Sequence, residues 1–153
     1  KCNLNERNKK IMTTSVKTNV NDYAKAITKN YFDYHMRSLT RDSHPHKDYA
    51  NEQIAEIENG TANLMKFEVR EGRKYYKVVQ SEFETWKGSI HYGNYRDSSV
   101  HSFVDKETGE VFKPASWNRP AKHVRYDMRD ERQLNYLLDS RNVDWAGGYL
   151  YLR

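Results

Sequence analysis

Two stretches in the second half of the chain alternate apolar and polar residues with the period of a half-buried β-strand. Residues 100–104 follow this pattern, and residues 110–113 resume it after a short polar interval. In that interval Asp105 can accept hydrogen bonds from the backbone that follows it, and Gly109 can adopt the positive φ that closes a hairpin loop. Pro114 cannot donate to a β-ladder and ends the second strand. The pattern predicts a β-hairpin.

Another hairpin is predicted earlier in the chain. In residues 64–69, the side chains of Met65, Phe67 and Val69 fall on one face of a strand. Residues 74–79 run back after a short polar turn. Together the two hairpins predict a meander of four antiparallel strands.

Helical periodicity lies before these strands. From Asn21 onward, Tyr23, Ile27, Tyr31 and Tyr34 recur on one face at spacings of four, four and three residues. The spacing predicts a helix whose aromatic stripe packs on the core.

A second helix is predicted to run to about residue 58. Ser43 or His44 is its expected cap, and Pro45 suits the first helical position. Gly60 suits the position beyond its end.

The C-terminal region is predicted to form a helix and then a strand. Asp127 is the expected cap of the helix, with Asp130 at the reciprocal capping-box position. The predicted buried face consists of Leu134, Leu137 and Leu138. Residues 149–152 are predicted to form a short final strand.

These elements predict an α+β fold: an antiparallel sheet of about four or five strands with two N-terminal helices and one helix before a short C-terminal strand. A single domain is expected over residues 21–153. Residues 1–20 are expected to be a disordered or vector-derived tail, because residues 1–11 lack periodicity and Met12 precedes small residues as an initiator does.

The connection over residues 80–99 has two interpretations. It is too long for a tight turn and contains two glycines among several aromatic residues. Either the meander strands lengthen into an arm with its own turn near Gly88, or the segment is a loop. Its aromatic side chains over residues 83–95 either cover the core or form an association surface.

Composition limits the classes of function. Charged residues make up 31% of the chain and hydrophobic residues 37%, so the core is expected to be small and partly built from the 12 tyrosines. The formal net charge of +5 permits anionic partners. Cys2 is the only cysteine, which excludes an intrachain disulfide and fits a reducing compartment. No apolar run approaches the roughly 20 residues of a membrane span, so no membrane partner is expected.

One segment, residues 113–132, mixes cations with aromatic side chains. Guanidinium groups bind phosphate oxygens in pairs, and an indole or phenol face stacks on a base. The sequence therefore predicts a site for an anionic aromatic ligand, nucleic acid or a small nucleotide, without a metal or cofactor. Its candidate ligand-binding residues are Trp117, Arg119, Lys122, His123, Arg125, Tyr126 and Arg129.

No catalytic motif is present. The chain lacks a nucleophile elbow, a phosphate-binding loop, a zinc-protease helix and a dinucleotide fingerprint. His101 and His123 flank the predicted hairpin, and only convergence of the two in the fold would favour an enzyme. A noncatalytic ligand-binding role is expected, with a structural or protein-interaction role, as a homo-oligomer or with another protein, as the alternative.

Several short sequence motifs of this chain occur together in one protein family. The chain resembles a family of small uncharacterised proteins that are encoded by tailed bacteriophages and found in environmental viral sequence. The resemblance covers residues 72–79, the central hairpin with the Lys-Pro-Ala-Ser-Trp that ends it, residues 120–126 and the ending at residues 144–153. The resemblance implies a phage accessory protein that acts in the host cytoplasm or is carried in the virion. It implies no activity and no site residues.

Overall fold

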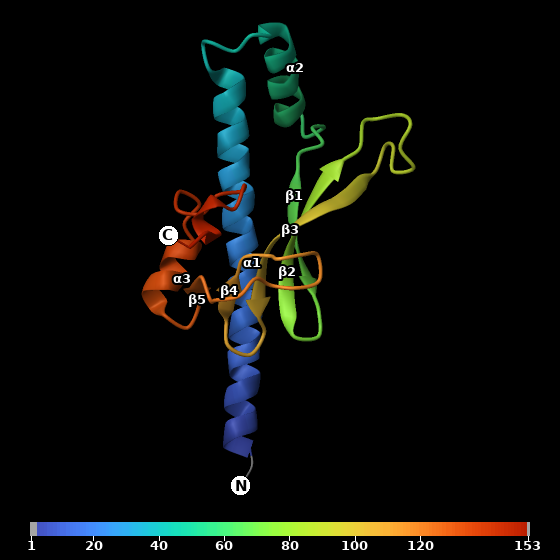
Figure 1. Ribbon diagram of the computed structural model, residues 1–153. Helices are drawn as coiled ribbons and strands as arrows, with labels where there is room; N and C mark the ends of the chain where they lie inside the picture. Colours follow the sequence, from blue (N-terminus) through green and yellow to red (C-terminus); the bar gives the residue numbers. More distant parts are fainter. Residues whose placement is uncertain (1–2, 153) are drawn as a thin grey trace.

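The computed structural model describes residues 3–152, with side chains described from residue 15 onward. Two helices precede an antiparallel five-stranded sheet, and one helix follows it, as the predicted α+β class requires (Figure 1). Within the described part of the chain, no helix combines the length and the apolar composition needed to cross a bilayer.

The first helix, α1 (Asn3–Thr40), runs the length of the molecule and forms one side of the core (Figure 1). Tyr23 and Ile27 are fully buried, as the aromatic and apolar stripe predicts. The helix begins far upstream of Asn21, in a stretch for which the sequence analysis predicted a tail. Val16 accounts for part of this difference, because it is buried in the core and extends the apolar face toward the N-terminus.

The second helix, α2 (Lys47–Glu58), ends where the sequence predicts but begins later. Its N-cap residue is His46, which makes no side-chain capping bond, and Pro45 lies outside the helix. The predicted cap His44 instead accepts a hydrogen bond on Nδ1 from the His46 N–H at 3.0 Å. Gly60 follows the helix in the left-handed region, with a φ of 72°.

The sheet is a meander in which spatial order equals sequence order. All neighbouring strands are antiparallel. The strands are β1 (Lys66–Glu71), β2 (Tyr75–Phe83), β3 (Tyr95–Asp105), β4 (Glu110–Phe112) and β5 (Tyr126–Asp127). The two predicted hairpins are confirmed as β1–β2 and β3–β4.

One face of the sheet packs on α1 to form the core. Tyr76, Val78, Val104 and Val111 belong to the same buried cluster as the α1 residues and have at most 1% of their surface exposed. Burial of side chains of this size stabilises a fold by about 1.5–3 kcal/mol each. The opposite face of the sheet is partly covered by the chain that follows β4.

The connection between β2 and β3 is an arm rather than a structureless loop. The two strands pair up to Phe83 and Tyr95, whose rings meet at 5.4 Å, and the arm projects away from the body (Figure 1). Its turn leaves Trp86, Ile90 and Tyr92 with 69%, 94% and 49% of their surfaces exposed. These three side chains therefore do not cover the core.

The β3–β4 hairpin closes as the sequence predicts. Asp105 Oδ1 accepts hydrogen bonds from the backbone N–H groups of Glu107 and Thr108 at 2.8 and 3.1 Å. Gly109 has a φ of 74°, and a Cβ there would lie 3.2 Å from the Cβ of Met128. Both the backbone conformation and the close approach therefore favour glycine at this position.

The C-terminal region differs from the prediction in two places. The helix α3 (Glu131–Leu137) is capped by Asp130, whose carboxylate accepts from the Arg132 N–H at 3.0 Å, whereas the predicted cap Asp127 lies in β5. The predicted final strand over residues 149–152 is absent. A 3-10 helix, η1 (Gly148–Leu150), takes its place and buries Leu150 rather than pairing with a sheet edge.

Candidate functional site

The basic segment that follows β4 folds into a small hairpin on the outer side of the sheet. Pro114 and Pro120 pair across it, and the Ala121 N–H donates to the Lys113 carbonyl at 2.7 Å. At the tip, the Arg119 carbonyl accepts from two backbone N–H groups. We call residues 113–121 the basic hairpin. Its shape is set by backbone hydrogen bonds, and Lys113, the first of its cations, lies 4.7 Å from the centroid of the Tyr151 ring.

Trp117 lies at the tip of the basic hairpin with 42% of its surface exposed. The Lys77 ammonium, from the outer face of β2, is 5.2 Å from the centroid of the Trp117 ring and 5.6 Å from that of Phe103. Such cation–π contacts contribute about 0.5–1 kcal/mol at exposed sites. These contacts hold the Trp117 indole beside Lys77, a cation that lies outside the predicted segment 113–132.

Arg119 and Lys122 are exposed, and the described residues offer neither side chain a hydrogen bond or an ion pair. His123 is also exposed and has a positive φ of 71°, a conformation that costs a non-glycine residue about 1–2 kcal/mol. His123 and His101 do not converge, because His101 lies in the core. The basic hairpin and the turn after it therefore present three polar side chains to solvent.

The Arg125 side chain makes three hydrogen bonds within the fold. Its Nη1 donates to the carbonyls of Lys122 and His123 at 2.7 and 2.6 Å, and its Nε donates to the Leu150 carbonyl at 2.6 Å. The guanidinium therefore joins the turn after the basic hairpin to the C-terminal segment. These bonds also help to hold His123 in its left-handed conformation.

Tyr126 and Arg129 are likewise engaged within the fold. The Tyr126 hydroxyl donates to the Tyr149 carbonyl at 3.0 Å, and its ring stacks on Tyr136 at 5.6 Å. Arg129 binds both carboxylate oxygens of Asp127 at 3.1 and 2.8 Å, and this pairing lowers the pKa of Asp127. The predicted set thus divides into solvent-facing residues of the basic hairpin region and residues that hold the C-terminal region together.

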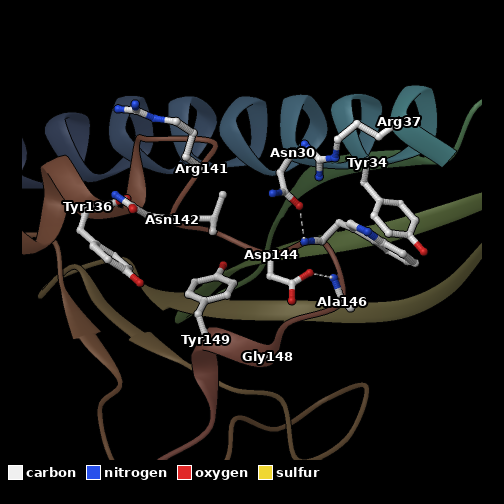
Figure 2. A pocket seen from close by; sticks show the side chains of 12 residues that line it. Asn30, Tyr34, Arg37, Tyr136, Arg141, Asn142, Asp144, Ala146, Gly148 and Tyr149 are labelled. Atoms are coloured by element: carbon white, nitrogen blue, oxygen red, sulfur yellow. Dashed lines mark hydrogen bonds between the residues drawn. The ribbon is translucent and has the colours of Figure 1, made fainter. Parts of the chain in front are cut away.

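A pocket of about 650 Å³ opens between α1 and the C-terminal segment (Figure 2). Asn30 of α1 connects its two sides, since its amide donates to the Ser140 carbonyl at 2.9 Å and its Oδ1 accepts from the Trp145 N–H at 2.9 Å. The Trp145 ring packs against the rings of Tyr31 and Tyr34 at 5.5 and 5.4 Å. We call this site the C-terminal pocket.

One acidic and two basic side chains line the C-terminal pocket. Asp144 Oδ1 accepts from the Ala146 N–H at 2.9 Å (Figure 2). Arg37, in the last turn of α1, makes no hydrogen bond or ion pair with any described residue. Arg141 is also on the wall, but Asp139 binds its guanidinium at 3.0 and 2.7 Å. Among the described residues that line the pocket, Arg37 is therefore the cation without an ionic partner.

A buried polar network lies behind the pocket. His101 Nε2 lies 2.9 Å from the Asp144 carbonyl, which can only accept, so Nε2 carries the proton. Nδ1 then accepts from the Ser102 hydroxyl at 3.2 Å, and burial lowers the pKa of His101. The hydroxyls of Tyr23 and Tyr149 bind each other, and burial raises the pKa of Tyr23 to about 12. The histidine is neutral and both its nitrogens are satisfied, as in a structural core residue.

The position of Asn30 in the sequence indicates part of this pocket. Asn30 lies on the same helical face as Ile27 and Tyr34, and a polar residue on an apolar stripe requires partners when it is buried. Nothing in the sequence showed that those partners are backbone groups more than 100 residues away, or that Lys77 lies beneath Trp117.

Comparisons with known proteins add one match. The model of a protein family described as a family of unknown function (DUF7717) matches residues 3–152. No curated protein and no solved structure matches the chain. The family match includes every described element, from α1 to η1.

Proposed function

This chain belongs to the DUF7717 family, whose description gives no activity. From the geometry of the basic hairpin, we propose that it is a noncatalytic protein that binds single-stranded nucleic acid. Trp117 stacks on a base, while Lys77, Arg119 and Lys122 contact phosphates. The observation that carries this proposal is the contact of Lys77 with the ring of Trp117. It places a cation from the sheet beside an exposed aromatic surface.

The charge distribution around this contact supports the proposal. Residues 113–126 contain four cations, Lys113, Arg119, Lys122 and Arg125, and no acidic residue. Residues 73–80 of the β1–β2 turn and β2 likewise contain cations and no acidic residue. The contact between Lys77 and Trp117 brings these two acid-free stretches together, and such a surface attracts the phosphate backbone.

The shape of the basic hairpin favours a strand over a small nucleotide. Small ligands bind in concave sites that bury most of their surface. Trp117 instead lies at the tip of the basic hairpin with 42% of its surface in solvent. Exposed stacking surfaces flanked by cations are typical of proteins that bind single strands without strong sequence preference.

The origin and cellular location of the protein are part of the same proposal. Its resemblance to proteins of tailed bacteriophages supports a phage accessory protein that acts on nucleic acid in the host cytoplasm. A component of the virion is the alternative, and the presence of the protein in purified particles would distinguish the two.

The test is fluorescence anisotropy with labelled single-stranded DNA of about twelve nucleotides, a length within the site size of comparable proteins. Trp117→Ala is expected to weaken binding roughly ten- to hundredfold, because one stacked base contributes about 1–3 kcal/mol. Trp86→Ala is the matched control, since Trp86 is a more exposed tryptophan on the arm. Equal affinity of wild type and Trp117→Ala would reject the proposed site.

A charge reversal provides a second test of the same site. Arg119→Glu is expected to abolish detectable binding at moderate salt, and Arg132→Glu on α3 should change it little. Native mass spectrometry of protein purified from cells, with absorbance at 260 and 280 nm, would identify any nucleic acid that copurifies. If wild-type protein binds neither DNA nor RNA strands, the proposed function is wrong.

A second candidate function is protein interaction through the arm. The exposure of Trp86, Ile90 and Tyr92 favours it, because aromatic side chains with so little cover are frequent at interface centres. The backbone of the tip is ordered by several turn hydrogen bonds, including Ser89 N–H to the Trp86 carbonyl at 3.1 Å. Light scattering of wild type and a Trp86→Ser, Ile90→Ser variant would test self-association through this tip.

A further inference from the structure

We propose that the C-terminal pocket binds a small zwitterionic molecule of the amino acid or short peptide class, with Arg37 holding its carboxylate and Asp144 its ammonium group. This site is separate from the basic hairpin, and the proposal does not depend on nucleic-acid binding. It rests on the volume of the pocket, on two opposite charges that do not pair with each other and on the aromatic rings that line the same pocket.

The walls of the pocket are held in place before any ligand arrives. The two hydrogen bonds of Asn30 fix the C-terminal segment against α1, and the Trp145 ring is enclosed by two tyrosine rings. A volume of about 650 Å³ lies within the range of sites for small ligands. A fixed site of this size needs little reorganisation to accept a ligand.

Asp144 presents one free carboxylate oxygen. Oδ1 is engaged by the Ala146 N–H, whereas no described residue binds Oδ2. The residue beside Oδ2 is Gly148, and a Cβ at that position would lie 3.2 Å from the oxygen. The absence of a side chain there leaves the approach to Oδ2 open, and an ammonium group with three donors suits such an oxygen.

Arg37 supplies the complementary charge. It extends from α1 on the same side of the pocket as Asn30 and Tyr34 (Figure 2). A guanidinium without an internal partner binds a carboxylate in a bidentate manner. Arg37 and Asp144 form no ion pair with each other, so both charges are available to a ligand that carries the two opposite groups.

The tyrosine rings of the pocket determine which ligand side chain is preferred. Tyr34 and Tyr136 have 49% and 39% of their surfaces exposed at the pocket. Their faces offer apolar contact to the side chain of the ligand. We therefore expect preference for an aromatic or large apolar amino acid over glycine.

The test is isothermal titration of the full chain with L-phenylalanine and with glycyl-L-phenylalanine, which separates the two charges further. L-Phenylalaninamide, which lacks the carboxylate, and N-acetyl-L-phenylalanine, which lacks the ammonium, are expected to bind at least about tenfold more weakly than the parent. If neither zwitterion binds at about 10 mM, or if an analogue lacking one charge binds as well, the proposal is overturned.

Variants of the chain locate the binding. Asp144→Asn keeps an oxygen for the Ala146 N–H and should weaken binding about tenfold, as should Arg37→Gln. Gly148→Ala should weaken it by crowding Oδ2. Arg141→Gln is the matched control, because Asp139 already pairs with that arginine. A fall in affinity in Arg141→Gln equal to that in Arg37→Gln would overturn the assignment of Arg37.

Discussion

The basic hairpin and the C-terminal pocket both combine aromatic rings with arginines, yet they use their side chains in opposite ways. Backbone hydrogen bonds close the basic hairpin, and the side chains of Trp117 and Arg119 take no part in them. In the C-terminal pocket, the side chain of Asn30 and one oxygen of Asp144 hold the walls by binding backbone N–H and carbonyl groups. Replacement of Arg119 therefore reports on binding alone, whereas replacement of Asn30 reports on folding and binding together.

The largest expected effect concerns Arg125, which joins the turn after the basic hairpin to the C-terminal segment. Arg125→Ala removes three hydrogen bonds from a charged donor to backbone carbonyls and is expected to lower the free energy of unfolding by about 3 kcal/mol. Arg125→Lys should restore little, because one ammonium cannot reproduce the planar fork. Urea denaturation measures both variants.

Arg119→Ala is the control for this comparison. Its side chain has no partner in the described chain, so its free energy of unfolding should change by less than about 0.5 kcal/mol. Equal destabilisation by Arg125→Ala and Arg119→Ala would show that Arg125 does not hold the turn to the C-terminal segment.

The next effect concerns the wall of the pocket. Asn30→Ala removes two hydrogen bonds between α1 and the C-terminal segment and should cost about 2 kcal/mol of unfolding free energy, at about 1 kcal/mol for each bond. Asn142→Ala is the control, because its single bond to the Tyr136 carbonyl is long, at 3.3 Å, and exposed. If thermal denaturation ranks the two variants equally, Asn30 does not fix the pocket.

Local patterns predicted the strands and turns well because their causes are local. Asp105 and Gly109 close their hairpin with groups only a few residues away. Residues 149–152 were predicted to form a short strand, yet residues 148–150 form η1, in which Leu150 is buried in the core and its carbonyl binds Arg125. A propensity for strand was overridden by a tertiary contact.

The composition of the candidate site could be read from the sequence, but the contacts of its side chains could not. A basic aromatic composition singled out residues 113–132, and the structure places Trp117 and Arg119 in solvent. Arg125 and Arg129 have the same composition signal but bind carbonyls or Asp127. Composition does not show which of these arginines has a partner within the fold, and the Leu150 carbonyl that binds Arg125 lies 25 residues further along the chain.

The polar network behind the pocket gives a pH dependence. Burial lowers the pKa of His101 in the folded protein, so the unfolded chain binds the proton more tightly. The contribution of neutral His101 to the free energy of unfolding is therefore fully present above the unfolded pKa of about 6.5. It decreases as the pH falls below that value, by at most about 1.4 kcal/mol for each pH unit. Denaturation at pH 8 and pH 5.5 measures the change.

His101→Asn should reduce this dependence, because the buried imidazole is then absent. A pH dependence that survives in His101→Asn would assign the titration to another group.

The smallest expected effect tests the openness of the basic hairpin. Lys122→Gln removes one exposed cation without altering a hydrogen bond of its side chain, so the free energy of unfolding should not change measurably. Affinity for single-stranded DNA should fall about threefold at 0.1 M salt, and the slope of log affinity against log salt should become shallower by about 0.7, the change expected when the protein neutralises one phosphate fewer. Lys87→Gln on the arm is the control, since it removes the same charge far along the chain from the basic hairpin. An identical slope for Lys122→Gln and wild type would mean that Lys122 binds no phosphate, and the binding surface would then be limited to Lys77, Trp117 and Arg119.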